Sequence, residues 1–271
     1  MTSSAPTPTS AHAQRVRHPL KFRLLQIKRV VPLGPRMLRV TLAGEELEGF
    51  TSLAHDDHVK LFFPAPGESR PPRPEVTPEG LHFADGVEKP AARDYTPRRY
   101  DAQAGELDID FVLHEEGVAT DWARAARPGD WIGVGGPRGS QLFGAGFDWY
   151  LLAGDATALP AIARRLEELP AGAHVVAVIE VADAEDELPL ASRADARVHW
   201  VHRAADELPG AALVRALGDL QLPAGKGFAW AACETETVQR LRDLLIEARG
   251  MPKDQVKVSA YWTRRGGLVE H

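Results

Sequence analysis

RDYTPRRYD, residues 93–101, places a tyrosine, a threonine and several arginines in one short extended segment. Because the side chains of a β-strand alternate between its two faces, Tyr95 presents an aromatic ring on one face. Thr96 and Arg98 then present a hydroxyl group and a guanidinium group on the other face. The segment therefore offers an aromatic surface and two kinds of hydrogen-bond donor within a few residues.

A flavin nucleotide requires this combination of groups. Its ring system packs against an aromatic or flat apolar neighbour, its polar edge takes a hydrogen-bond donor, and its pyrophosphate binds a guanidinium fork. The pattern Arg-x-Tyr-Thr-x-Arg, from Arg93 to Arg98, is similar to the FAD signature of the ferredoxin-reductase superfamily. The alternative is a charged surface strand followed by a turn, since short motifs also recur by chance.

Composition narrows the class of protein. The 271 residues exceed the usual size of one domain, and the net charge of −6 argues against nucleic acid as the main partner. Cys233 is the only cysteine, which excludes an intrachain disulfide and an iron–sulfur cluster held by four thiolates. No apolar run approaches the roughly 20 residues that span a bilayer, and Met1–Gln14 lacks the pattern of a secretory signal. We therefore expect a cytoplasmic monomer that does not insert into a membrane.

Residues 18–145 are predicted to form an antiparallel β-barrel, preceded by a disordered tail over residues 1–17. Short apolar runs stop at proline and glycine turns, and a proline-rich loop covers Pro64–Pro78. Apolar and polar residues alternate along Glu106–Leu113, which is typical of a half-buried strand. The predicted strands are Lys21–Val31, Met37–Leu42, His58–Phe63, Arg93–Tyr100, Glu106–Leu113 and Trp131–Val134, with one helix at Thr120–Ala126. Many short strands with one helix favour a closed barrel.

In residues 146–271 the predicted strands and helices alternate along the chain. His174–Val181 is a continuous apolar run, as expected for a strand covered on both faces. The other predicted strands are Trp149–Ala153, Val198–His202, Phe228–Ala232 and Gln255–Trp262, and the predicted helices are Leu159–Leu169, Ala211–Leu220 and Glu236–Arg249. This alternation predicts a doubly wound parallel sheet.

The first strand-to-helix turn of this second half is a candidate nucleotide site, because nucleotides bind at the carboxyl ends of parallel strands. The turn contains Gly154, Asp155 and Thr157, followed by Pro160 in the first helical turn. A strand–turn–helix without any ligand is the alternative. Cations that could hold the 2′-phosphate of NADPH follow the relevant strands at Arg193 and Arg203, although surface arginines would look the same.

A second candidate phosphate site lies at the start of the predicted Thr120–Ala126 helix. Gly117 and small residues lead from a strand into this helix, where unpaired backbone amides and the helix dipole favour an anion. Thr120 adds a hydroxyl group. Glu115, Glu116 and Asp121 would repel a pyrophosphate unless they face away, so a capped surface helix is the alternative.

The end of the chain combines aromatic residues with cations. Tyr261 or Trp262 could shield a flavin ring, and Arg264 or Arg265 could hold an anionic substrate. The alternative is a tryptophan packed in the core and followed by a solvated basic tail. The histidines show no metal-ligand spacing, so no protein metal site is predicted.

Seven short motifs, taken in order, resemble the siderophore-interacting protein family. Its members are FAD-dependent ferric-siderophore reductases of the ferredoxin-reductase superfamily. The motifs lie at residues 57–64, 93–98, 108–114, 119–123, 136–140, 154–160 and 261–266, so the resemblance covers the chain from about Lys21 to Gly267. In one place the family usually has Gly-Pro-Ala-Ser where this chain has Gly117-Val118-Ala119-Thr120, which keeps a hydroxyl group.

The resemblance implies an N-terminal FAD-binding barrel followed by a pyridine-nucleotide domain, with specific residues in each role. FAD contacts are implied for Arg93, Tyr95, Thr96, Arg98, His114, Ala119 and Thr120, with Thr96 near flavin N5. Docking of an anionic ferric siderophore is implied for Lys60, Arg138 and one of Arg264 or Arg265. Further cofactor contacts are expected at Gly154, Asp155, Thr157, Tyr261 and Trp262.

The working hypothesis is that NADPH or NADH reduces FAD, which then reduces the ferric siderophore and releases Fe(II) in the cytoplasm. Two other functions fit the same fold. One is a reductase of ferredoxin or flavodoxin type, and the other is a non-catalytic flavoprotein that binds siderophores. The sequence leaves open whether ferredoxin is the physiological donor and which siderophore is bound.

Overall fold

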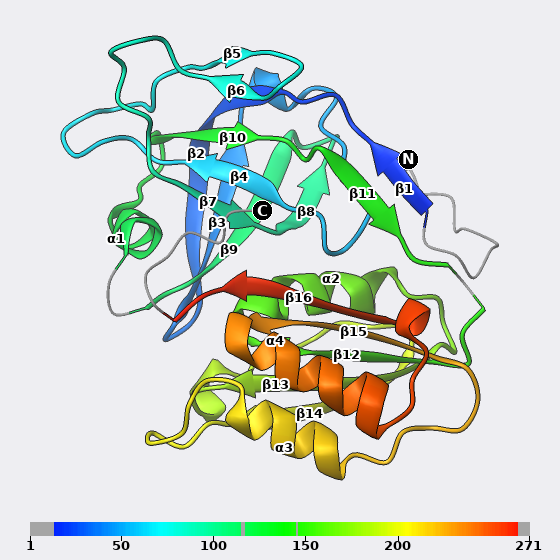
Figure 1. Ribbon diagram of the computed structural model, residues 1–271. Helices are drawn as coiled ribbons and strands as arrows, with labels where there is room; N and C mark the ends of the chain where they lie inside the picture. The colour runs from blue at the N-terminus through cyan, green and yellow to red at the C-terminus, as the bar shows by residue number, and fades with distance from the viewer. Residues whose placement is uncertain (1–13, 115–116, 145, 265–271) are drawn as a thin grey trace. The chain divides into compact units, whose positions relative to one another are not determined.

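The computed structural model describes residues 14–264 with the exception of 115–116 and 145 (Figure 1). Contacts divide the chain into two compact units, and the division between them lies between Phe143 and Gly144. We refer to the described residues up to Phe143 as unit 1 and to those from Gly144 as unit 2.

Unit 1 is built on one seven-stranded antiparallel sheet. The strand order is β7-β4-β10-β2-β3-β9-β8, so β7 and β8 form its two edges. Only Thr96 separates these two strands in sequence, and the sheet must therefore curl until its edges approach each other. The strands are β2 (Phe22–Gly34), β3 (Met37–Ala43), β4 (Val59–Phe62), β7 (Ala92–Tyr95), β8 (Pro97–Asp101), β9 (Glu106–Val112) and β10 (Trp131–Gly135). The predicted antiparallel barrel is thus present as a curled sheet. The expected closure is not, since β7 and β8 are not hydrogen-bonded neighbours in the strand order.

Smaller elements complete unit 1. Strand β1 (Gln14–Arg17) pairs with β11 (Gly139–Leu142), although we had assigned these N-terminal residues to a disordered tail. Their pairing with a distant strand is a tertiary contact, which composition does not reveal. Two short strands, β5 (Glu75–Val76) and β6 (Leu81–His82), form an antiparallel hairpin. The first of them lies within the predicted proline-rich loop, and the second follows that loop. The unit also has a 3-10 turn at Glu45–Leu47 and the helix α1 (Val118–Ala125).

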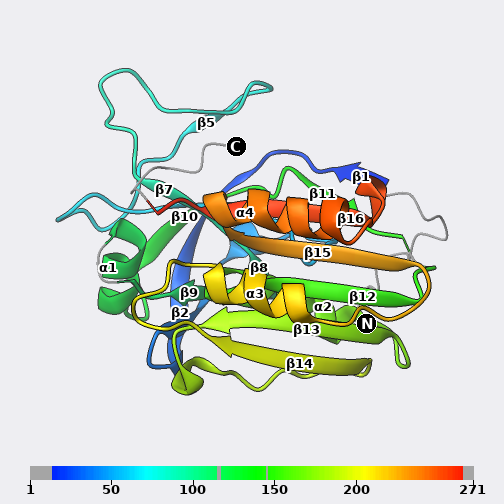
Figure 2. The same ribbon diagram turned by 60° about the horizontal axis from the view of Figure 1, so that its bottom comes forward.

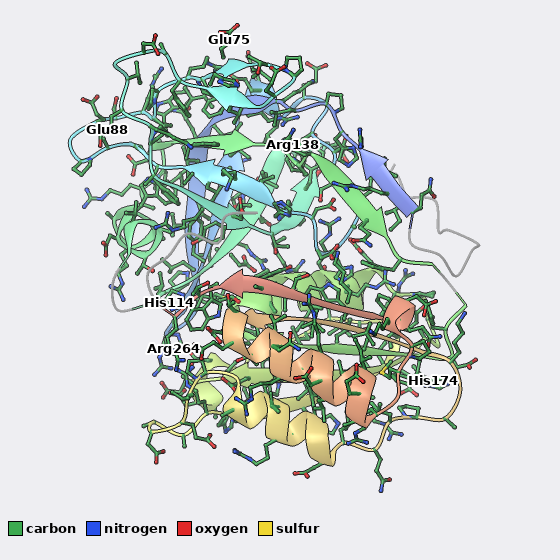
Figure 3. All side chains as sticks on the ribbon, in the orientation of Figure 1. Glu75, Glu88, His114, Arg138, His174 and Arg264 are labelled. Atoms are coloured by element: carbon green, nitrogen blue, oxygen red, sulfur yellow. The ribbon has the colours of Figure 1, made fainter. Side chains whose placement is uncertain are left out.

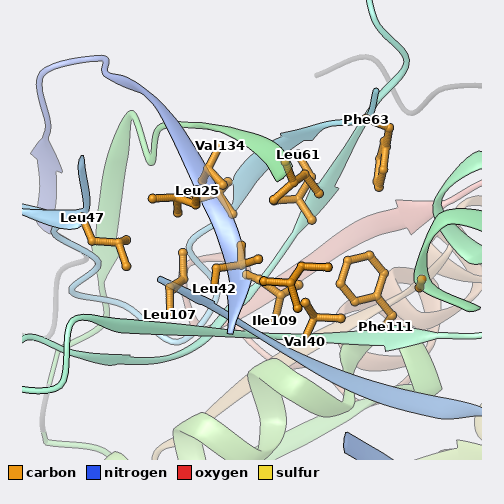
Figure 4. Packing of buried hydrophobic residues seen from close by; sticks show 14 of the residues in the cluster. Leu25, Val40, Leu42, Leu47, Leu61, Phe63, Leu107, Ile109, Phe111 and Val134 are labelled. Atoms are coloured by element: carbon orange, nitrogen blue, oxygen red, sulfur yellow. The ribbon is translucent and has the colours of Figure 1, made fainter. Parts of the chain in front are cut away.

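The core of unit 1 is the inner face of the curled sheet (Figure 4). Leu107, Ile109 and Phe111 of β9 pack there with apolar residues of the other strands, as the period of two predicts. The outward residues of β9 were expected to be exposed, but Glu106, Asp108 and Asp110 are also buried. Guanidinium groups cover them. The arginine–carboxylate pairs are Arg29 with Glu106 at 2.7 Å, Arg39 with Asp110 at 2.7 Å, and Arg99 with Asp108 at 2.7 Å.

Unit 2 is a five-stranded parallel sheet with helices on both faces, as predicted (Figure 2). The strand order is β14-β13-β12-β15-β16, with β12 (Trp149–Asp155), β13 (His174–Val181), β14 (Asp195–His202), β15 (Gly227–Glu234) and β16 (Val256–Trp262). The helices α3 (Ala211–Asp219) and α4 (Thr235–Arg242) cover one face, and α2 (Leu159–Glu168) covers the other. A π-helical turn at Asp243–Ala248 extends α4, and 3-10 turns occur at Ala156–Ala158, Ala184–Asp186 and Lys253–Gln255.

Helices of the described segments are all short. None of them has both the length and the apolar character that a bilayer crossing requires.

Candidate functional site

The segment that opened the sequence analysis does not form one continuous strand. Residues 92–95 belong to β7 and residues 97–101 to β8, and the chain turns from one sheet edge to the other at Thr96, which is buried. Simple alternation along a single strand therefore does not describe how these side chains are arranged. Arg98 lies at a register shift in the pairing of β8 with β9. Its Nε atom is 3.9 Å from Oδ2 of Asp110.

Tyr95 presents an aromatic ring at the edge of the core. The centroid of its ring lies 4.4 Å from that of Phe111, and Phe111 in turn packs on Trp122 at 5.7 Å. This partial burial raises the pKa of the Tyr95 phenol, so the ring stays neutral. The residue as a whole is half-buried. The neighbouring Arg93 is also half-buried and donates from Nη1 to the carbonyl oxygen of Ala92 at 2.7 Å.

Helix α1 begins earlier than the sequence suggested. Its N-cap is Gly117, with φ 142°, and the helix therefore starts before the predicted Thr120. The hydroxyl of Thr120 instead accepts a hydrogen bond of 3.2 Å from the backbone N–H of His114. This bond ties the first turn of the helix to the segment that follows β9. A backbone hydrogen bond runs from the Asp121 amide to the Gly117 carbonyl, at 2.8 Å. The amides of Ala119 and Thr120 lie before it in the helix.

The first turn of α1 fits a phosphate group. A Cβ atom added at Gly117 would meet no described atom within 4 Å other than those of its chain neighbours. Amides at a helix N-terminus carry the positive end of the helix dipole and favour an anion. Three carboxylates could oppose a phosphate here. Asp121 lies in the first turn of the helix, and Glu115 and Glu116 lie outside the described residues.

Unit 1 thus supplies each type of group that an FAD requires. Tyr95 offers the aromatic surface, Arg93 and Arg98 offer guanidinium groups, and the first turn of α1 offers amides. The residues predicted from the sequence fit the cofactor, and their individual contacts remain predictions.

The cations predicted to dock the substrate are not all bare. Nζ of Lys60 lies 2.9 Å from Oδ1 of Asp94. Arg138 is exposed and follows β10 (Figure 3), whose residue Gly135 pairs with Lys60 across the sheet. In unit 2, Nη2 of Arg264 lies 2.5 Å from Oε2 of Glu236. The other candidate, Arg265, lies outside the described residues.

In the predicted nucleotide-binding turn of unit 2, the polar side chains form hydrogen bonds within the protein. The carboxylate of Asp155 accepts hydrogen bonds from the amide of Thr157 at 2.9 Å, the hydroxyl of Thr157 at 2.5 Å and the indole of Trp262 at 2.8 Å. A Cβ atom at Gly154 would lie 2.4 Å from the carbonyl oxygen of Ala232 and 2.5 Å from Ala158. Gly154 therefore allows close packing here. The polar groups of Asp155 and Thr157 position Trp262 and the turn.

Two buried carboxylates at the same edge of the sheet were missed. Glu180 ends the apolar part of β13 and accepts from the amides of Gly210 and Leu213, at 2.9 and 3.0 Å. Glu234 ends β15 and accepts from the amide of Glu236 at 2.8 Å. Burial raises the pKa of the fully buried thiol of Cys233, and the carboxylates of Asp155, Glu234 and Glu180 add to this shift, so Cys233 is a core residue. The signal in the sequence was an acidic residue directly after an apolar strand.

Tyr261 of β16 packs against the neighbouring strand β15. Its ring centroid is 6.2 Å from that of Trp230, and the backbone carbonyl of Trp262 accepts from the hydroxyl of Thr235 at 3.0 Å. The end of β16 is thereby fixed to the start of α4. Whether either aromatic side chain contacts a cofactor remains a prediction.

Comparison with known proteins gives the family. The model of the siderophore-interacting FAD-binding domain matches residues 26–141, and the model of the siderophore-interacting protein matches residues 147–265. The chain is 39% identical over 257 residues to the NADPH-dependent ferric-chelate reductase of Escherichia coli K12, covering 94% of this chain and 98% of that protein. It is 36% identical over 247 residues to the ferric vibriobactin reductase ViuB of Vibrio cholerae, covering 89% of each.

Solved structures agree with this result. A siderophore utilization protein from T. fusca superposes with a TM-score of 0.87 and 40% identity, covering 96% of this chain and 99% of that chain. The ferredoxin reductase of a carbazole 1,9a-dioxygenase has a TM-score of 0.60 at 15% identity, covering 90% of this chain and 68% of that one, and shows the shared fold. The predictions of a ferredoxin-reductase-like fold and of an FAD-binding domain are confirmed. The chain therefore belongs to the siderophore-interacting protein family.

Proposed function

We propose that this protein is an NADPH-dependent, FAD-containing reductase of ferric siderophores. The observation that carries the proposal is the set of groups in unit 1, where the half-buried Tyr95 ring, two arginines and the first turn of α1 suit a flavin dinucleotide. Two relatives whose names describe ferric-chelate and ferric-vibriobactin reductases support the same enzyme class.

The residues of unit 1 would divide the work of holding FAD. Tyr95 packs against the ring system, while Arg93 and Arg98 neutralise the pyrophosphate. Ala119 and Thr120 bind phosphate through their amides, and His114 is held beside them by its bond to Thr120. Thr96, buried between the two edge strands, would lie near flavin N5. Bound FAD would supply the redox chemistry, taking up a hydride and passing on single electrons.

The ferric siderophore would dock through cations. Lys60 and Arg138 in unit 1, and Arg264 or Arg265 in unit 2, are the proposed docking groups. Once the iron is reduced, hard oxygen donors hold it far more weakly, and Fe(II) would leave in the cytoplasm. No acid, base or nucleophile of the protein has to act in this scheme.

NADPH is the proposed donor because the E. coli relative is named as NADPH-dependent. NADH and a reduced ferredoxin are the competing donors, and each would give a different result in the same assay. The carboxyl edge of the unit 2 sheet, where the internal contacts of Asp155 and Glu234 lie, is the proposed nucleotide-binding region.

The test uses the purified full chain loaded with FAD under anaerobic conditions. NADPH should bleach the flavin absorbance, and a ferric siderophore should restore it while a ferrous-specific chelator reports Fe(II). If only reduced ferredoxin bleaches the flavin, then ferredoxin, and not NADPH, is the electron donor. A chain that binds FAD but reduces no ferric chelate with any of these donors would be a siderophore-binding flavoprotein, and the proposal would be wrong.

A further inference from the structure

The backbone that carries Arg138 is enclosed by the rest of unit 1. Residues 136–140, which we call the docking turn, run from the end of β10 into β11. All five are described by the structure, and Arg138 is the one exposed residue among them (Figure 3). Gly136, Pro137 and Ser140 are buried. The Arg138 side chain therefore reaches solvent from a buried stretch of chain.

The hydroxyl group of Ser140 joins the docking turn to two distant segments. It donates to Oδ2 of Asp57 at 2.6 Å and accepts from the backbone amide of Leu53 at 3.1 Å. Nε2 of His18 lies 2.8 Å from the same oxygen. Because the carboxylate only accepts, the serine hydroxyl is its donor, and the imidazole must then donate to the serine oxygen. Ser140 and Asp57 are 2% and 3% exposed, so the network lies away from water.

The set of Ser140, His18 and Asp57 is not arranged as a nucleophilic triad. In such a triad the imidazole accepts the serine proton and the carboxylate binds the imidazole. Here the carboxylate binds the serine directly, and the imidazole donates to the serine oxygen. The buried hydroxyl group is therefore an anchor for the chain and not a nucleophile.

The other end of the docking turn is held as well. Nη1 of Arg23, a residue that is 4% exposed, donates to the carbonyl oxygen of Gly136 at 3.0 Å. The amide of Gly136 donates to the carbonyl oxygen of Lys21 at 3.0 Å, and the carbonyl oxygen of Arg138 accepts from the amide of His18 at 3.0 Å. The backbone is thus fixed before, at and after the exposed arginine.

We propose that Ser140 is a positioning residue for substrate docking. Its bond to Asp57 ties the docking turn to the segment that leads into β4, and Lys60 of β4 pairs with Gly135 just before the turn. The hydroxyl group thereby fixes the backbone of Arg138 relative to Lys60. A fixed backbone reduces the conformational entropy that is lost when the two cations close on an anion. The inference rests on the proposed function for the docking role of these cations.

The first experiment compares Ser140→Ala with Thr41→Val in the FAD-loaded full chain. Thr41 is the matched control, because its buried hydroxyl group also donates to a carboxylate, that of Asp108, at 2.6 Å. It lies in β3, which pairs with neither β10 nor β11. The probe is an anionic gallium(III) triscatecholate, since Ga(III) matches Fe(III) in charge and is not reduced, and binding is read from fluorescence quenching. We expect Ser140→Ala to weaken binding about fivefold and Thr41→Val less than about twofold.

A double-mutant cycle tests whether Ser140 acts through Arg138. In the Arg138→Met background, Ser140→Ala should weaken gallium binding by less than about twofold, because the cation that it positions is gone. Reduction of the matching ferric complex gives a second reading. KM should rise about as much as the affinity falls, whereas kcat should change by less than about twofold. FAD content and circular dichroism check that each variant is folded.

A spin label measures the docking turn without any siderophore. Cys233 is fully buried, so a nitroxide reagent labels the thiol introduced by Arg138→Cys or, as the control, by Glu75→Cys in the exposed strand β5. Adding Ser140→Ala should increase the mobility of the label at position 138 and leave that at position 75 unchanged. His18→Leu removes only the imidazole donor, from a half-buried position, and should give a smaller change of the same kind if Ser140→Ala does not fold.

Two results would overturn the inference. One is a label at position 138 whose mobility neither Ser140→Ala nor His18→Leu changes. The other is an equal loss of gallium affinity from Ser140→Ala with and without the Arg138 side chain. A chain that binds the gallium complex in the expected Ser140-dependent way but reduces no ferric complex would reject the reductase function and support the inference, so the two failures are distinguishable.

Discussion

Both units contain rows of buried carboxylates, and the two rows are stabilised by different partners. In unit 1, Glu106 of β9 pairs with Arg29, Lys28 and Arg99, and these cations hold the pKa of its carboxyl well below the ordinary range. In unit 2, Asp155 and Glu180 are bound mainly by backbone amides and neutral donors, and burial raises the pKa of both. The same chemical group is thus kept charged by cations in one region and costs free energy to ionise in the other.

The two rows also have different positions and partners in the fold. The unit 1 carboxylates anchor arginines that cover the outside of the barrel. The unit 2 carboxylates accept hydrogen bonds from backbone amides at the start of a helix and from the indole of Trp262. Removing a unit 2 carboxylate should therefore leave buried donors unpaired, whereas removing one from unit 1 should mainly change the response to pH.

The largest effect is expected at Asp155. Asp155→Ala would leave the indole N–H of Trp262 and the amide and hydroxyl of Thr157 without their acceptor. We expect the free energy of unfolding to fall by roughly 3 kcal/mol in urea titrations. Asp206→Ala, an exposed loop change in the same unit, is the control and should stay within about 0.5 kcal/mol of the wild type. A loss as small as that of the control would mean that water replaces the carboxylate.

The turn that carries Asp155 offers the second test. Gly154→Ala would push a methyl group against the backbone oxygen of Ala232 and the side chain of Ala158, so a loss of about 2 kcal/mol is expected. Gly218→Ala in α3 is the matched control, because a Cβ atom there meets no atom within 4 Å. That change should instead stabilise the helix by about 0.5 kcal/mol. Equal stabilities of the two variants would contradict the packing role of Gly154.

The pH dependence of stability should distinguish the two rows. The pKa of Glu106 is lowered on folding from its ordinary 4.5, so its stabilising contribution is present above that pH and is lost as the pH falls below it. For Asp155, whose pKa is raised above 3.8, the native state takes up the proton first, so stability falls as the pH rises through that range. Thermal unfolding of Glu106→Gln between about pH 6 and about pH 3 should therefore show a flatter acid limb than the wild type. If the loss of stability at acid pH is the same in Glu106→Gln, in the control Glu75→Gln and in the wild type, then other groups cause the acid sensitivity.

The smallest effect on stability is expected at the docking lysine. The ion pair of Lys60 with Asp94 is largely exposed on one side, and such pairs contribute less than about 1 kcal/mol. Lys60→Met should therefore leave the urea midpoint almost unchanged while it weakens the binding of an anionic gallium siderophore. A large loss of stability would show that the pair serves the barrel rather than a ligand.

Much of the fold followed from local patterns. The alternation along residues 106–113 placed Leu107, Ile109 and Phe111 in the core, and the alternation of strands and helices after residue 146 predicted the parallel sheet. The partners of individual polar groups could not be predicted in this way. Arg99 meets Asp108 because β8 and β9 are paired in one particular register, and the pattern of each strand alone does not specify the register.

The candidate site shows the same division. Arg93, Tyr95 and Arg98 could be identified as candidate flavin-binding residues because they lie within one short motif. The neutralisation of Lys60 by Asp94 was missed, because the two residues are far apart in sequence and meet only through the pairing of β4 with β7. The internal role of Asp155 was missed for a similar reason, since its partner Trp262 comes from the last strand.

Periodicity and short contiguous motifs were sufficient to predict the class of each half, the family resemblance and the residue types available for a flavin. The tertiary structure alone decided that residues 93–101 divide between two sheet edges and which cations keep a net charge. Those properties depend on strand register and burial. Hydrogen bonds and ion pairs act over a few ångströms, so they form only between groups that folding brings together from distant parts of the chain.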